Sequence, residues 1–96
     1  MSNYELNDLG DGRFELSGEM SFKTANSILK SSSKNFGQYE SLELDMSKVG
    51  KADSAGLALM VEWQAQTRRR AAKIRFVAVP ESLRAIAVTC DVADLI

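Results

Sequence analysis

The sequence predicts a small α/β domain: a four-stranded mixed sheet in the order ββαβαβα, with helices chiefly on one face. Three observations lead to this prediction. Short segments in which apolar and polar residues alternate are interleaved with longer segments of helical periodicity. Two of the strands alternate strictly, so we expect one face of the sheet to contact solvent. The first two strands are separated only by the turn at residues 10–12, and must therefore be antiparallel neighbours.

The N-terminal half reads as a hairpin, a helix and a third strand. The hairpin strands are expected at residues 4–9 and 13–18, around a Gly-Asp-Gly turn. A helix follows over residues 22–34, with Ser21 as its expected N-cap. The third strand, residues 41–46, again alternates. The helix is expected to bury one face, formed by Phe22, Ala25, Ile28, Leu29 and Ser32.

The C-terminal half continues the alternation of strands and helices. A polar loop at residues 47–53 leads into the longest helix, residues 54–71. A strand follows at residues 73–79, and a last helix begins at Pro80 and ends near Cys90. Strand–helix–strand units of this length form right-handed parallel crossovers, so the first strand is expected to be the antiparallel edge strand. The last apolar residues are expected to fold back onto the domain: Val92, Leu95 and Ile96.

Composition narrows the class of protein. The chain has 96 residues, of which 45% are hydrophobic, enough for one core, so residues 1–96 are expected to form a single domain. Twelve Lys and Arg oppose 13 Asp and Glu, a net charge of −1, which argues against a dedicated nucleic-acid binder. The start of the sequence lacks the pattern of a signal peptide, and the longest strongly apolar run, residues 57–61, is too short to span a membrane. We therefore expect a cytosolic protein.

The chain is poor in residues that carry chemistry. It contains no histidine, which excludes Ser-His-Asp and Cys-His catalysis and every metal site that uses histidine. Its one cysteine, Cys90, allows no intrachain disulfide and is expected to be a small core residue. Asp45 and Asp53 suggest a pair of carboxylates, but one is expected on the wet sheet face and the other at a helix cap. No phosphate-binding loop is present. We expect no enzyme, no metal and no cofactor.

One segment, residues 49–60, is the most informative. A strand ends, a polar loop follows, and a helix opens on Asp53, Ser54, Ala55 and Gly56. Asp53 or Ser54 can cap the first turn, and a glycine allows close approach of neighbouring backbone. Two interpretations are open. The segment is either only a capped helix, or a docking loop that presents a hydroxyl at the positive end of a helix.

This segment resembles a known family. Asp53-Ser54-Ala55-Gly56-Leu57, after the strand at residues 42–47, is similar to the signature of STAS domains, which include anti-sigma factor antagonists and the cytosolic domains of sulfate transporters. The resemblance covers nearly the whole chain, including residues 79–84 at the start of the last helix. Residues 56–63 are most similar to the MlaB-like subgroup, the small STAS subunits of phospholipid-transport ABC complexes in Gram-negative bacteria.

The resemblance implies a binding role. In the antagonists the serine that matches Ser54 is phosphorylated, and in the MlaB-like subgroup the matching hydroxyl lies at the contact with the ATPase subunit. It implies a non-enzymatic partner of the ATPase of an ABC transporter that maintains the lipid asymmetry of the outer membrane, held at the inner membrane only through that partner. The alternative is an anti-sigma factor antagonist, bound by an anti-sigma factor or kinase and switched at Ser54. Ala55 stands where antagonists usually have a second serine.

The helix after the motif also suggests a partner. Its first two turns are apolar around most of the circumference, wider than the stripe with which a helix covers a sheet. We expect Leu59 and Trp63 to lie outside the core as partner anchors, because tryptophan is frequent at interface hot spots; the alternative is a broad core face. The basic residues at 68–70, with Lys73 and Arg75, complement the helix dipole or contact an anionic partner. The expected partner-binding residues are Asp53, Ser54, Ala55, Gly56, Leu57, Leu59 and Trp63.

Overall fold

The computed structural model describes residues 3–90, and the element order is the predicted one. Residues 92, 95 and 96, which were expected to fold back onto the domain, lie outside the described residues. The elements are β1 (Tyr4–Gly10), β2 (Arg13–Met20), α1 (Ala25–Phe36), β3 (Ser41–Ala52), α2 (Ser54–Arg69), β4 (Lys73–Val77) and α3 (Glu81–Thr89).

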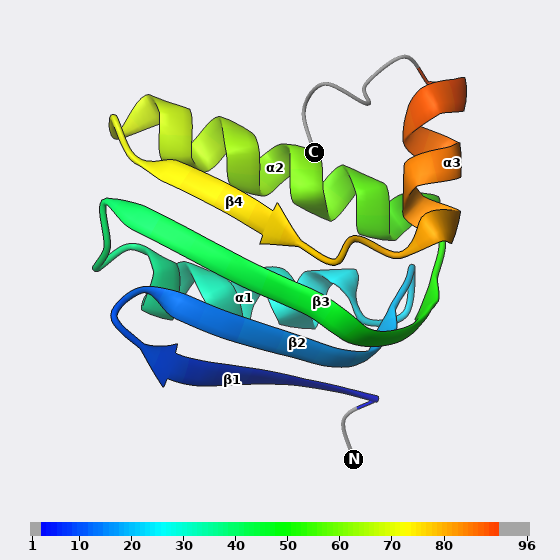
Figure 1. The fold of residues 1–96 in the computed structure, drawn as a ribbon, viewed down its shortest axis with the longest axis horizontal. Helices are drawn as coiled ribbons and strands as arrows, with labels where there is room; N and C mark the ends of the chain where they lie inside the picture. Colours follow the sequence, from blue (N-terminus) through cyan, green and yellow to red (C-terminus); the bar gives the residue numbers. More distant parts are fainter. Residues whose placement is uncertain (1–2, 91–96) are drawn as a thin grey trace.

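The four strands form one mixed sheet in the order β1-β2-β3-β4 (Figure 1). β1 pairs antiparallel with β2 at one edge, as predicted, while the pairs β2–β3 and β3–β4 are parallel. The register brings Phe14, Leu44 and Phe76 side by side across β2, β3 and β4. Because side chains alternate along a strand, this row and the rows two residues away, such as Leu42 with Ile74, form one continuous apolar face.

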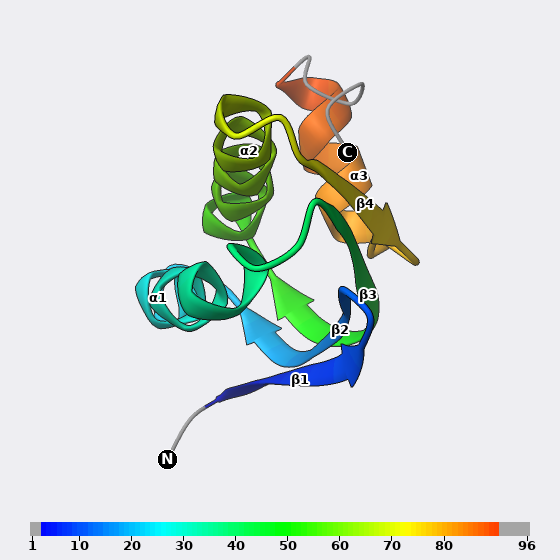
Figure 2. The ribbon, with the colours of Figure 1, turned by 90° about the vertical axis from the view of Figure 1, so that its left-hand side faces the viewer.

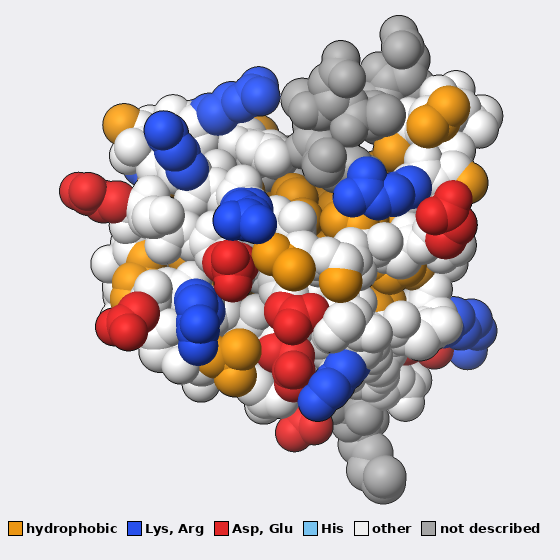
Figure 3. All heavy atoms as spheres, in the orientation of Figure 1, with side chains coloured by type: hydrophobic (Ala, Val, Ile, Leu, Met, Phe, Trp, Pro, Cys, Tyr) orange, Lys and Arg blue, Asp and Glu red, His pale blue; other side chains and the backbone are white. Residues whose placement is uncertain are grey.

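The helices lie chiefly on that apolar face, which confirms the predicted layering. α1 and α2 cover it, and α3 packs beside the first half of α2, beyond the end of β4 (Figures 1 and 2). The opposite face carries charged side chains of both signs (Figure 3). Two ion pairs cross neighbouring strands there, Lys48 with Glu15 at 3.5 Å and Arg75 with Glu43 at 3.9 Å. This face is therefore the wet one.

Aromatic rings join the layers of the core. Phe14 of β2 contacts Phe36 of α1, with ring centroids 4.8 Å apart, and Phe36 contacts Trp63 of α2 at 5.6 Å. Trp63 in turn lies 6.2 Å from Phe76 of β4. Such tilted ring pairs add to the energy of burial. One cluster thus ties both helices of the covered face to the sheet.

Two element boundaries differ from the prediction: the end of β3, and the start of the helix that follows β2. β3 continues to Ala52, so residues 47–53 are not a loop. Its second half pairs only with β2, for example Lys48 with Ser17, and the register shifts twice along this pairing. Helix α1 begins at Ala25 rather than at residue 22, because Thr24 and not Ser21 is the N-cap residue. Phe22 therefore lies outside the helix and is 86% exposed, not buried.

The C-terminal elements also depart in detail. β4 ends at Val77, where the next residue, Ala78, adopts a φ of 56°. Pro80 is the N-cap residue of α3, one position before the helix. Cys90 was expected in the core but is exposed, because it forms the C-cap of α3 at the surface. No helix within residues 3–90 is long and apolar enough to span a membrane.

Candidate functional site

The candidate site lies where two parallel strands end. β2 and β3 run parallel and their last paired residues are Met20 and Ala52. The carboxyl ends of parallel strands meet at one edge of the sheet, so the loop after β2 and the start of α2 are neighbours. This edge brings residues 21–24 next to residues 53–56, although 31 positions separate Phe22 from Asp53 in the sequence.

Asp53 connects the two segments through its carboxylate. One oxygen, Oδ1, accepts a hydrogen bond from the backbone N–H of Ala55 at 2.9 Å, and the other, Oδ2, accepts one from the N–H of Phe22 at 3.2 Å. The first bond confirms the prediction that Asp53 caps α2. The second was not predicted. A single carboxylate therefore holds the loop after β2 against the helix start.

The loop after β2 is itself held in one conformation. The N–H of Ser21 donates to Oγ1 of Thr24 at 3.0 Å, and the Thr24 hydroxyl donates to the carbonyl oxygen of Glu19 at 2.9 Å. The Ser21 hydroxyl donates to the Glu19 carboxylate. Both hydroxyl residues are buried. Because the turn is bonded internally, the side chain of Phe22 at its tip points to solvent.

Gly56 confirms the expected close approach. A Cβ at this position would lie 2.7 Å from the carbonyl oxygen of Met20 and 3.4 Å from a methyl group of Leu83. The first turn of α2 thus rests directly on the end of β2 and against α3. Gly56 and Leu57 are both buried, so among the predicted partner-binding residues these two position the helix and do not offer surface to a partner.

Ser54 is exposed as the first residue of α2. The first turn of a helix carries free N–H groups and a positive dipole end, which favour an acceptor or an anion nearby. Ala55 is partly buried beside it, and Ala58, one turn later, is exposed. Ser54, Phe22 and Ala58 are therefore all exposed at this end of the domain.

Leu59 and Trp63 were expected outside the core, and that expectation is wrong. Leu59 is 4% exposed and Trp63 is 1% exposed. The Trp63 indole N–H donates to Oγ of Ser32, on α1, at 2.8 Å. The reason is that α2 contacts the sheet, α1 and α3 together, so its buried arc is wider than that of a helix with one neighbour. The first two turns of α2 are apolar around most of their circumference because the helix packs against three neighbours.

Phe22 is the surface residue that the sequence analysis missed. Two hydroxyl residues, Ser21 and Thr24, are each suitable N-caps, and the choice of Ser21 placed Phe22 on the buried face. Choosing Thr24 as the cap leaves Phe22 outside the helix. The presence of a second possible N-cap residue in the sequence was the signal that Phe22 could lie outside the helix. The hydrogen bonds within the turn favour Thr24 over Ser21 as the N-cap residue.

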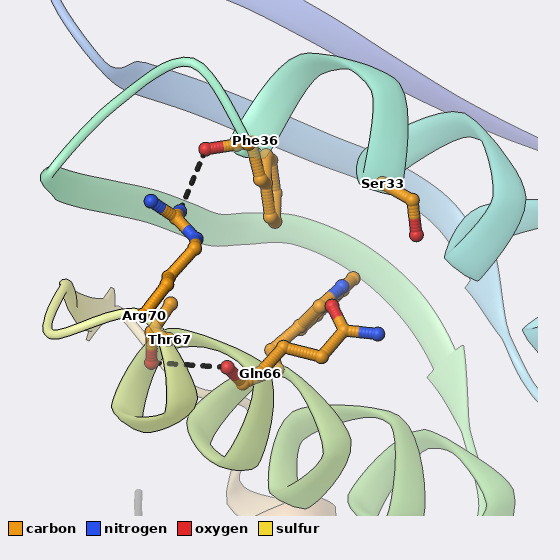
Figure 4. Close-up of a pocket in the computed structure, with 7 residues that line it drawn as sticks. Ser33, Phe36, Gln66, Thr67 and Arg70 are labelled. Atoms are coloured by element: carbon orange, nitrogen blue, oxygen red, sulfur yellow. Dashed lines mark hydrogen bonds between the residues drawn. The ribbon is translucent and has the colours of Figure 1, made fainter.

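A groove runs between α1 and α2 away from this end. Its first hollow, about 210 Å³, is largely apolar and lies next to Ser54. It is lined by Ala25, Asn26, Leu29, Ala55, Ala58, Leu59 and Glu62. A second hollow, about 290 Å³, lies at the far end of both helices (Figure 4). There Arg70 donates to the carbonyl oxygens of Phe36 at 2.8 Å and Tyr39 at 2.7 Å.

The other charged candidates are accounted for by local contacts. Arg70 donates to a carbonyl oxygen at the end of α1, where a positive charge is favoured. Arg69 lies 3.8 Å from Glu62 and forms an ion pair with it. Part of the basic segment therefore makes contacts within the domain. Asp45 accepts a hydrogen bond from the N–H of Ser47 at 2.8 Å, and this bond holds the pKa of Asp45 below its ordinary value. Asp53 instead caps α2, so each carboxylate is engaged by its own loop. Within residues 3–90, no group of three or more acidic or Cys side chains could hold a metal ion.

Comparisons with known proteins agree with this fold. The family model described as "Mlab, STAS domain" matches residues 7–96. The structure is similar to that of the anti-sigma factor antagonist SpoIIAA in its unphosphorylated form, with a TM-score of 0.74 at 12% identity over 96% of this chain and 84% of that one. The phosphorylated form of SpoIIAA, a Bacillus cell fate determinant, has a TM-score of 0.71 at 12% identity over 96% and 86%. No curated protein sequence matches the chain.

Proposed function

Because the chain belongs to the STAS domain family, in its MlaB-type branch, we propose that it is a non-enzymatic adaptor that binds a larger protein through the end of the domain formed by Phe22, Asp53 and Ser54. The observation that carries this proposal is the carboxylate of Asp53. It holds the loop after β2 against the start of α2 and so presents an exposed phenyl ring and an exposed hydroxyl on one surface.

This surface has the properties of a docking site. Phe22 is 86% exposed, and aromatic side chains, phenylalanine included, are enriched at the centres of protein interfaces. The neighbouring serine adds a hydrogen-bond donor and acceptor at a positive helix end. Because the backbone around both residues is held by hydrogen bonds, a partner has little ordering entropy to overcome when it binds.

The partner we propose is the ATPase subunit of an ABC transporter for phospholipids. The description of the matching family supports this choice. In this role the domain lies in the cytosol and reaches the inner membrane only through the ATPase. Docking at the Ser54 end favours the ATPase conformation that fits the surface, and the binding energy stabilises that conformation. The transport would serve outer-membrane lipid asymmetry. The domain needs no cofactor for this.

A second candidate is an anti-sigma factor antagonist controlled by phosphorylation of Ser54. The structural similarity to SpoIIAA in both of its forms favours it. Ser54 is also exposed, as a kinase substrate must be. A phosphate there would sit at the N-terminus of α2, which tolerates negative charge. In this role the partner is an anti-sigma factor, or the kinase that phosphorylates Ser54.

One experiment separates the two candidates. The chain, tagged and expressed at native level, is purified from its own cells and the co-purifying proteins are identified by mass spectrometry. An ABC ATPase in stoichiometric amount supports the first proposal, and an anti-sigma factor supports the second. Recovery of neither, from cells in which the tagged chain is shown to replace the native one, would contradict both.

A titration then tests the surface. Ser54→Glu should leave the fold intact, because a carboxylate suits the helix start. It should weaken binding to the purified partner at least tenfold, because the new charge is desolvated beside Asp53. Ser27→Glu is the matched control, since Ser27 is exposed on α1. Equal affinities of the two variants would remove Ser54 from the interface.

A further inference from the structure

The groove between α1 and α2 continues the exposed Ser54 end along the full length of both helices. Its two hollows are lined by successive turns of the same helix faces. On α1, Leu29 lines the first hollow and Ser33 the second; on α2, Glu62 lines the first and Gln66 the second. Residues four apart lie above one another on a helix. The hollows are therefore two parts of one groove.

The length over which the two hollows extend suits a helix. From Ala55 to Arg70 it follows α2 for about 22 Å, at 1.5 Å per residue. Its wall near Ser54 is built of small side chains, Ala25, Ala55 and Ala58, which allow another backbone to approach closely. The exposed ring of Phe22 lies in the loop directly before α1, at the same end of the groove.

The charges along the groove are ordered. The end next to Ser54 is lined by apolar residues and Asn26, and Arg70 lies at the far end. Glu62 follows near the middle; its ion pair with Arg69, at 3.8 Å, is exposed to solvent, so its carboxylate can still be reached by a partner. Arg70 contacts two carbonyl oxygens, which are neutral, so its positive charge remains. Glu62 and Arg70 are separated by about 12 Å along the helix axis. α1 and α2 also run in the same direction, so both dipoles place their positive ends beside Ser54.

We propose that this groove binds one amphipathic helix of a partner protein, antiparallel to α1 and α2. The helix would begin near Arg70 with an acidic residue, carry a basic residue about two turns later opposite Glu62, and end with apolar residues against the alanines and Phe22. The antiparallel direction opposes the two dipoles of the domain and places the acidic residue in the first turn of the bound helix, where it is favoured. This inference rests on the proposed protein-binding function and adds the form and the charge order of the partner segment.

A selection experiment tests the proposal without knowledge of the natural partner. The probe is a library of stable helical mini-proteins in which one 15-residue helix has a randomised face, displayed and selected against the wild-type domain. Selected helices should show the order acidic, basic, apolar from their N-terminus, enriched at least tenfold over the unselected library. They should bind Ala58→Glu at least tenfold more weakly, because this substitution places a charge in the apolar hollow.

Controls make each result decisive. Ala58 and Ala85 are both exposed on helices, so Ala85→Glu on α3 is the matched control and should bind as the wild type does. If Ala58→Glu fails to fold by circular dichroism, Asn26→Glu at the opposite wall replaces it. No enrichment, helices without the charge order, or equal binding to both alanine variants would overturn the proposal.

One other occupant of the groove, and the separate failure of either proposal, are outcomes of the same study. A wild-type dimer in light scattering that Ala58→Glu converts to a monomer would assign the groove to a second copy of the chain and overturn the proposal. Co-purification of the ATPase with unchanged affinity for Ala58→Glu would support the proposed function and overturn only the groove. Selected helices that bind as expected, when no ATPase co-purifies with the chain, would support the groove and overturn the proposed function.

Discussion

Trp63 offers the sharpest test of how α2 is packed. The side chain is 1% exposed, contacts Phe36 and Phe76, and donates to the hydroxyl of Ser32, which is also buried. Trp63→Ala removes this whole contribution and should cost about 3–5 kcal/mol of unfolding free energy. A domain of this size has only about 5–15 kcal/mol in total, so this variant can leave the domain largely unfolded.

The quantitative variant is therefore Trp63→Phe. A phenyl ring keeps part of the packing against Phe36 but loses one ring and the hydrogen bond to Ser32. We expect a cost of about 1–3 kcal/mol. A double-mutant cycle with Ser32→Ala isolates the hydrogen bond, which should couple the two sites by about 0.5–1.5 kcal/mol.

The assay is urea denaturation followed by circular dichroism, because the variants lack the chain's one tryptophan and fluorescence would be lost. Leu9→Ala, at a residue 47% exposed on β1, is the control and should change stability by no more than about 0.5 kcal/mol. A loss below about 1 kcal/mol for Trp63→Ala, with partner binding abolished, would refute this reasoning and return Trp63 to the interface.

Two further predictions follow from single contacts, and a third follows from the lack of a phosphate-binding loop in the sequence. Gly56→Ala should destabilise the domain by about 1–3 kcal/mol in urea denaturation, because its Cβ would press on the Met20 carbonyl, whereas Gly50→Ala, with open space around it, should be nearly neutral. The lowered pKa of Asp45 should stabilise the domain above the unfolded-state value of about 3.9, and this contribution should disappear as the pH falls through the lower folded-state value; thermal unfolding of Asp45→Asn should lack this acid dependence. Calorimetry with ATP and magnesium should give no heat of binding, and micromolar affinity would contradict the adaptor role.

The features that depend on local sequence were predictable from sequence alone. Periodicity determined the order of strands and helices, because side-chain alternation and helical spacing are properties of short segments. The capping role of Asp53 and the close approach at Gly56 were also predicted, since a helix start needs an acceptor and a tight contact needs a residue without a side chain. The family resemblance depended on the same few residues.

Tertiary structure alone decided which side chains reach the surface. Leu59 and Trp63 are buried because α2 has neighbours on three sides, and the number of neighbours is not encoded in the periodicity of one helix. Phe22 is exposed because bonds from the Ser21 turn and from Asp53, far along the chain, hold its loop. The apolar content of a segment shows that it can be buried; only the arrangement of the other elements determines which residues are left for a partner.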